Sequence, residues 1–169
     1  MIKKLKNKNH GFTLLETILY VAILSTLVFG IASFVGLVSE VRVKNQVMSE
    51  VDQQAVQILE AVKVAVQSGE SVSSPTIGQS QNILQIVNID DSMTVFSLDS
   101  GVFTIDRGDG PTSLHNNRVV VDSVIFRNLS HVGTPSIVRV TINLSYKNIS
   151  INQIYNYSKT YVAGAQLSK

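Results

Sequence analysis

The chain of 169 residues contains no cysteine. This absence excludes disulfide bonds and thiolate metal sites, so any extracytoplasmic domain must be held together by packing alone. It leaves the redox compartment undetermined. The length suits one domain of ordinary size with additional elements and is short for two independent cores.

A large excess of charge of either sign is also missing. The chain has 14 basic and 12 acidic side chains, a formal net charge of +2. Four of the basic residues, Lys3, Lys4, Lys6 and Lys8, precede Phe12, so the rest of the chain has ten basic and twelve acidic side chains, a formal −2. No Lys/Arg stripe interleaved with aromatic residues occurs in the body of the chain. Nucleic-acid binding is therefore not expected, except indirectly in DNA uptake.

Charged residues are absent altogether between Thr17 and Ser39, where Leu, Ile, Val, Ala and Phe dominate. At about 1.5 Å rise per residue, this run is long enough to cross a hydrocarbon core of about 30 Å as a helix. Lysines precede it and a chain of mixed charge follows it, which predicts a single-pass cytoplasmic membrane protein. Its N-terminus should lie inside the cell and the remainder outside.

Two simple interpretations of this N-terminus remain open. The first is a secretory signal peptide with a small-x-small cleavage site before Ser33. The apolar run continues past that site through Val38, and a carboxylate at Glu16 is unusual for such a peptide. The second is a plain membrane anchor, which accounts for the length of the run but gives no reason for Gly11, Phe12 and Glu16.

The stretch Gly11-Phe-Thr-Leu-Leu-Glu16, behind a short lysine-rich leader, resembles the N-terminal processing motif of type IV pilins and pseudopilins. The resemblance implies that a prepilin peptidase cuts between Gly11 and Phe12 and methylates the new amino terminus on Phe12. It also implies that Glu16 meets the terminal amine of a neighbouring subunit as an assembly salt bridge. A carboxylate inside a membrane is costly and is usually functional and paired. A simpler interpretation of Glu16 is a charge that is tolerated near a helix N-terminus.

The helix is expected to continue beyond the membrane. Apolar residues recur at spacings of three and four from Val41 to Val66, and most of the charged residues fall between them. No proline interrupts the stretch, and Gly69 is a plausible stop after Ser68. We therefore predict one helix from Phe12 to Ser68.

Short runs typical of β-strands follow a polar segment. The clearest is Ile137 to Tyr146, which alternates apolar and polar residues. Leu98 to Val102 predicts a tight hairpin turn and Asp106 to Pro111 a loop. The predicted fold is α+β and pilin-like, with a long N-terminal helical spine, transmembrane and then amphipathic, packed against a head made of one antiparallel β-sheet. The predicted segments are a leader (1–11), a transmembrane and filament-core helix (12–38), its amphipathic continuation (39–68), a linker loop (69–82), the β head (83–163) and a tail (164–169).

The head loosely resembles the J-type minor pseudopilins in the run from Leu114 to Phe126 and in the strand that follows it. We therefore predict a structural subunit, in the first place a minor one, of a type IV pilus-like or pseudopilus filament. A type II secretion or DNA-uptake pseudopilin is the alternative within this class, and a membrane-anchored binding module is the alternative outside it. The implied partners are the prepilin peptidase, other pilin-like subunits and an inner-membrane assembly platform.

Other candidate sites are weak. Asp99, Asp106 and Asp109 could contribute oxygen ligands to a calcium loop, although turn chemistry explains them equally simply. His115 and His131 have no spacing typical of a zinc site. No Ser/His/Asp set, phosphate loop or carboxylate pair stands out, so we expect neither enzymatic activity nor a cofactor.

Overall fold

The structure is a computed structural model that describes residues 13–147 and 156–168. The chain divides into two compact units, Met1–Arg42 and Val43–Lys169. The first unit holds the apolar part of helix α1 (Leu14–Ser68). The second holds the rest of this helix and, among its described residues, nine β-strands. The predicted α+β fold is confirmed.

Helix α1 buries one face in the second unit. Its buried residues follow the spacing predicted from the sequence: Val47, Val51, Ala55, Ile58, Val62, Ala65 and Val66. The helix ends at Ser68 as predicted, and the N–H of Gly69 donates to the carbonyls of Ala65 and Val66. A Cβ at Gly69 would lie 2.3 Å from Cγ2 of Ile86, so strand and helix approach too closely for any other residue.

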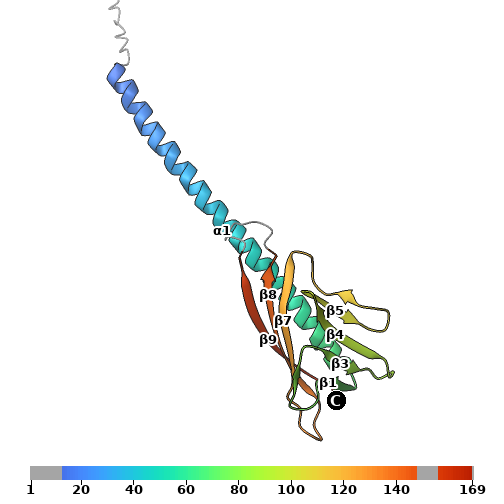
Figure 1. Cartoon of the computed structure of the whole chain (residues 1–169). Helices are drawn as coiled ribbons and strands as arrows, with labels where there is room; N and C mark the ends of the chain where they lie inside the picture. Colours follow the sequence, from blue (N-terminus) through green and yellow to red (C-terminus); the bar gives the residue numbers. More distant parts are fainter. Residues whose placement is uncertain (1–12, 148–155, 169) are drawn as a thin grey trace, which may run out of the picture. The chain divides into compact units, whose positions relative to one another are not determined.

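The strands form two antiparallel sheets, where the sequence suggested one. Sheet A has the order β1-β3-β4-β5-β6 and comprises β1 (Ser71–Ser74), β3 (Leu84–Val87), β4 (Met93–Asp99), β5 (Val102–Asp106) and β6 (Thr112–Ser113). Sheet B has the order β2-β7-β8-β9 and comprises β2 (Ser80–Gln81), β7 (Val119–Asn128), β8 (Ile137–Tyr146) and β9 (Ser158–Gln166). In Figure 1, β9 and β8 lie on one side of the head and β3, β4 and β5 on the other.

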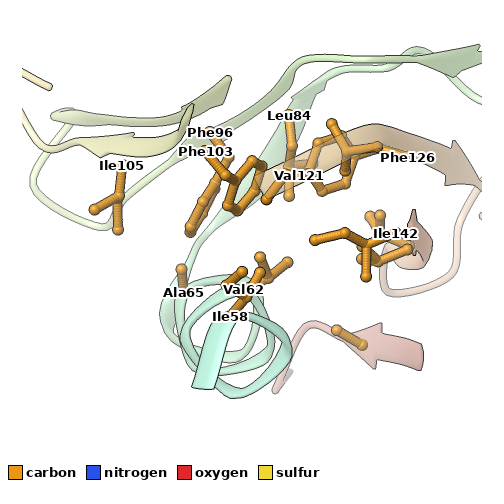
Figure 2. Close-up of a cluster of buried hydrophobic side chains, with 14 of the residues drawn as sticks. Ile58, Val62, Ala65, Leu84, Phe96, Phe103, Ile105, Val121, Phe126 and Ile142 are labelled. Carbon is orange, nitrogen blue, oxygen red and sulfur yellow. The ribbon is translucent and has the colours of Figure 1, made fainter. Parts of the chain in front are cut away.

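The core forms where both sheets meet the helix (Figure 2). Ile58 and Val62 point up from the helix toward side chains of both sheets. The ring centroid of Phe103 in β5 lies 6.0 Å from that of Phe96 in β4 and 6.3 Å from that of Phe126 in β7. All three rings are fully buried, so Phe103 joins the aromatic groups of the two sheets.

Three local predictions differ in outcome. Ser100 and Gly101, at φ 50° and 81°, form the predicted tight turn between β4 and β5. The segment 69–82, expected to be a linker loop, contains the short strands β1 and β2. The tail expected from residue 164 begins inside β9, which reaches Gln166 through its pairing with Ile137 of β8. Pairing with a neighbouring strand holds the polar residues of β1 and β2 and the small residues at the end of β9 in an extended conformation, whatever their own β propensity.

Polar contacts also join the helix to the sheets. Asp52 accepts hydrogen bonds from the ammonium group of Lys159, at 2.9 Å, and from the hydroxyl of Tyr161. The bond from Lys159, followed by that from Tyr161, lowers the pKa of Asp52, and burial together with Asp52 raises the pKa of Tyr161. Asp52 therefore stays ionised and Tyr161 protonated at neutral pH. Both contacts attach edge strand β9 to the helix.

A second contact joins the helix to the loop before β7. The side-chain amide of Asn116 donates to Oε1 of Glu50, and the Asn116 backbone N–H donates to Oε1 of Gln54 at 3.0 Å. A guanidinium nitrogen of Arg118 lies 3.9 Å from Oε2 of Glu50. These contacts hold the loop before β7 against helix α1, close to the first buried residues of the helix.

Candidate functional site

Thr13 caps the N-terminus of helix α1. Its hydroxyl accepts a hydrogen bond from the Glu16 backbone N–H at 3.3 Å, and its carbonyl accepts one from the Thr17 N–H at 3.2 Å. The spacing Thr-x-x-Glu is that of a capping box, and the bond to the Thr13 hydroxyl satisfies one of the N–H groups that lack a helical partner at the start of a helix. The sequence carried this signal, and it places Glu16 in the first helical turn.

The carboxylate of Glu16 has one partner from the same helix. The hydroxyl of Tyr20, one turn further on, donates to Oε1 of Glu16 at 3.0 Å. Residues four apart share a helix face, so this bond needs no distortion of the chain. One hydrogen bond from a neutral donor satisfies only part of a carboxylate, which has room for about four. Oε2 accepts no hydrogen bond from the residues that the structure describes and can therefore take a donor from outside the helix.

The hydroxyl groups farther along the apolar run bond within the helix. Four of them donate to the carbonyl oxygen four residues earlier, at 2.7 to 2.9 Å: Ser25, Thr26, Ser33 and Ser39. A hydroxyl bonded in this way does not require water. The segment can therefore enter a bilayer or a helix bundle without unpaired hydroxyl donors at these four positions.

The apolar side chains of this segment have no partner in the described chain. From Leu14 to Leu37 the large apolar residues are between 51% and 81% exposed. The 18-residue window of highest hydropathy averages 2.4 and has no buried residue. By length and composition this helix can cross a membrane. Such an exposed apolar surface requires lipid or other helices around it.

The processing residues predicted from the sequence lie outside the described residues. These are Gly11, Phe12 and the leader lysines Lys3, Lys4, Lys6 and Lys8. Among the described residues, the structure brings Tyr20 to Glu16, a partner that the sequence analysis missed although its spacing of four was visible. The role of Glu16 in assembly and the cleavage before Phe12 remain predictions.

Two of the three aspartates considered for calcium, Asp99 and Asp106, accept hydrogen bonds within turns. Asp106 accepts hydrogen bonds from the N–H groups of Gly108 and Gly110, at 2.8 and 3.2 Å, and Asp99 accepts one from the Ser100 hydroxyl at 3.0 Å. No group of three or more His, Asp or Glu side chains suited to a metal ion occurs in residues 13–147 and 156–168.

His115 also has a structural role. Its Nε2 accepts from the Phe103 backbone N–H at 3.0 Å, and its Nδ1 lies 2.8 Å from the Asn116 carbonyl oxygen. The ring thus joins β5 to the loop that contacts the helix.

Comparison with known families identifies the N-terminus. Residues 6–32 match the family model of the prokaryotic N-terminal methylation motif. The N-terminus is of the type IV pilin and pseudopilin type. This pilin-type motif covers the leader end, Gly11, Phe12, Glu16 and the first part of the apolar run, and it implies processing by a prepilin peptidase.

The comparisons give no family for the head. Neither a curated protein nor a solved structure gives a significant match to the chain. The J-type resemblance therefore stays a prediction, and the pilin-like order of helix and antiparallel strands rests on the structure itself.

Proposed function

We propose that the chain is a structural subunit of a type IV pilus-like or pseudopilus filament. One observation carries this proposal: the pilin-type motif at residues 6–32 runs directly into a helix whose apolar side chains are exposed and whose first turn contains a carboxylate, Glu16. A structural role fits this arrangement, because the motif serves to process and assemble subunits.

The proposed sequence of events begins in the cytoplasmic membrane. The precursor is held there by the apolar helix, with the leader lysines inside and the head outside. The prepilin peptidase hydrolyses the Gly11–Phe12 bond and methylates the new amine of Phe12. Processed subunits then leave the membrane through an inner-membrane assembly platform, and their apolar helices pack together as the filament core.

Glu16 sets the register of this packing. In the filament core its second oxygen, Oε2, meets the positive terminal amine of a neighbouring Phe12, so both charges are neutralised in an apolar environment. A misplaced subunit would leave both charges unpaired, which is strongly unfavourable at low dielectric. Tyr20 holds the carboxylate in place through its hydrogen bond.

The kind of filament that the chain enters is a finer question within the same class of function. A pilus, a type II secretion pseudopilus and a DNA-uptake pseudopilus all use this N-terminal arrangement. The minor role, in which a subunit starts or caps the filament, remains a prediction from the J-type resemblance alone. Other pilin-like subunits are the expected neighbours in each case.

Electron microscopy of sheared cell-surface material tests this proposal. Filaments labelled by gold-conjugated antibody against the head should be present in cells that express the chain with its own processing enzymes. They should be absent from matched cells lacking the prepilin peptidase, in which the chain stays in the membrane fraction. Label confined to the membrane of both strains would instead indicate the anchored binding module.

A further inference from the structure

Two arginines stand directly opposite each other on the exposed face of sheet B. Arg127 of β7 pairs with Arg139 of β8, and both side chains are exposed. Like charges placed directly across two strands destabilise a sheet. Neither guanidinium takes part in the ion pairs of the described residues, which involve Lys63, Arg118 and Lys159. Within residues 13–147 and 156–168 this unfavourable pair therefore has no acidic partner.

The surroundings leave this pair accessible. Gly164 of β9 lies beside Arg139, and a Cβ built on it would meet nothing within 4 Å. The next row across the sheet is Ile125, Thr141 and Val162, in which Ile125 is 49% and Val162 62% exposed. We call Ile125, Arg127, Arg139, Thr141 and Val162 the arginine face. It combines two arginines that form no ion pair with the described residues and exposed apolar side chains, which suits an anionic polypeptide segment with an apolar residue of its own.

A surface of the opposite character lies in the turn between β3 and β4. Ile89 is 79% exposed, and the adjacent Asp90 and Asp91 are exposed and take part in none of the described ion pairs. We call these three residues the acidic turn. Its shape is held by bonds from the Asn88 N–H to the Ser92 carbonyl, at 2.8 Å, and from the Ser92 hydroxyl to Asp90, at 2.6 Å. The hydrogen bonds from Ser92 also lower the pKa of Asp90, which keeps it ionised.

The two surfaces cannot neutralise each other within one head. The acidic turn joins two strands of sheet A, whereas the arginine face belongs to sheet B. Figure 1 shows β3 and β4 on the side of the head opposite to β9. A complementary pair of patches on different sides of one molecule makes a head-to-tail contact, which repeats from copy to copy.

We propose that the acidic turn of one copy docks on the arginine face of the next copy along the filament, an inference that rests on the proposed function. Asp90 and Asp91 accept hydrogen bonds from Arg127 and Arg139, and Ile89 packs against Ile125 and Val162. Residues 69–169 contain seven basic and seven acidic side chains, so the head offers no excess of positive charge to a nucleic acid. A contact between identical copies departs from the minor role predicted by the sequence.

Cross-linking of the full-length chain tests this contact, because the natural chain has no cysteine to interfere. The double substitution Ile89→Cys and Thr141→Cys leaves in place the charges of both arginines and both aspartates of the proposed contact. Filaments of this double variant, treated with a short bifunctional maleimide, should give a ladder of multimers on a denaturing gel. Each single variant should give no species larger than a dimer, since a ladder requires both positions in every copy.

Charge reversal then identifies the basis of the contact. Adding Arg127→Asp and Arg139→Asp to the double-cysteine chain should reduce the ladder by about tenfold or more, because like charges then face each other. Further addition of Asp90→Arg and Asp91→Arg should restore it, which also shows that the reversed chain folds.

Two results would overturn the contact. One is filaments that form normally without a ladder, which removes this contact and leaves the filament function intact. The other is a ladder unaffected by reversal of the arginines. If neither parent nor variants form filaments at all, the proposed function fails and the contact fails with it.

Discussion

Replacing Glu16 by alanine should abolish filament assembly while leaving membrane insertion intact. The terminal amine of the neighbouring Phe12 would then be left without its counter-charge in an apolar core. Removing one partner of a buried ion pair costs about 3–5 kcal/mol, which corresponds to roughly two to four orders of magnitude in an equilibrium constant. Insertion should even become slightly easier, because a carboxylate is removed from the membrane. Fractionation of sheared filaments and membranes, followed by immunoblotting, measures both quantities.

Two further variants separate charge from hydrogen bonding and from helix content. Glu16→Gln keeps an acceptor for the Tyr20 hydroxyl but loses the charge, so it should fail to assemble as alanine does. Glu40→Ala removes an exposed carboxylate from the same helix, outside the uncharged run, and should assemble normally. Normal filaments from Glu16→Gln would show that the ion pair is not the basis of assembly.

The largest loss of head stability is expected for Phe103→Ala. Phe103 is fully buried and stacks on Phe96 in its own sheet and on Phe126 in the other. Its removal leaves a cavity at the junction of the sheets, and Phe→Ala in a core typically costs about 3–5 kcal/mol. This is a large fraction of the about 5–15 kcal/mol that stabilises an ordinary domain. Denaturant unfolding of the full chain in detergent, followed by near-ultraviolet circular dichroism, measures the change.

The matched control for this substitution is Val132→Ala. Val132 is 91% exposed, so its truncation should change the free energy of unfolding by less than about 0.5 kcal/mol. A loss below about 1 kcal/mol for Phe103→Ala would mean that the two sheets do not share one core through this ring.

The helix was largely predictable from the sequence because its determinants are local. The spacing of Val51, Ile58 and Val62 set the buried face, and Gly69 set the end. The turn at Ser100 and Gly101 was predictable for the same reason, since an Asp-Ser-Gly run favours positive φ. Thr13 and Tyr20 at the candidate site also lay within reach, as their spacing from Glu16 carries the information.

The sheets were less predictable because their pairing is long-range. β1 and β2 contain Ser and Gln in place of alternating apolar residues, and only their neighbours β3 and β7 hold them as strands. The division into two sheets depends on which strands pair, which alternation along one strand does not specify. The contact of Asp52 with Lys159 joins residues more than a hundred positions apart, and no local pattern announces it.

Processing at the N-terminal motif is measured most directly by the intact mass of the protein in sheared filaments, with fragment spectra of its N-terminus. Cleavage and methylation by a prepilin peptidase would give a chain that begins at Phe12 and carries one added methyl group on its amine. A chain that begins at Ser33, or one that retains Met1 in cells with an active prepilin peptidase, would contradict this processing.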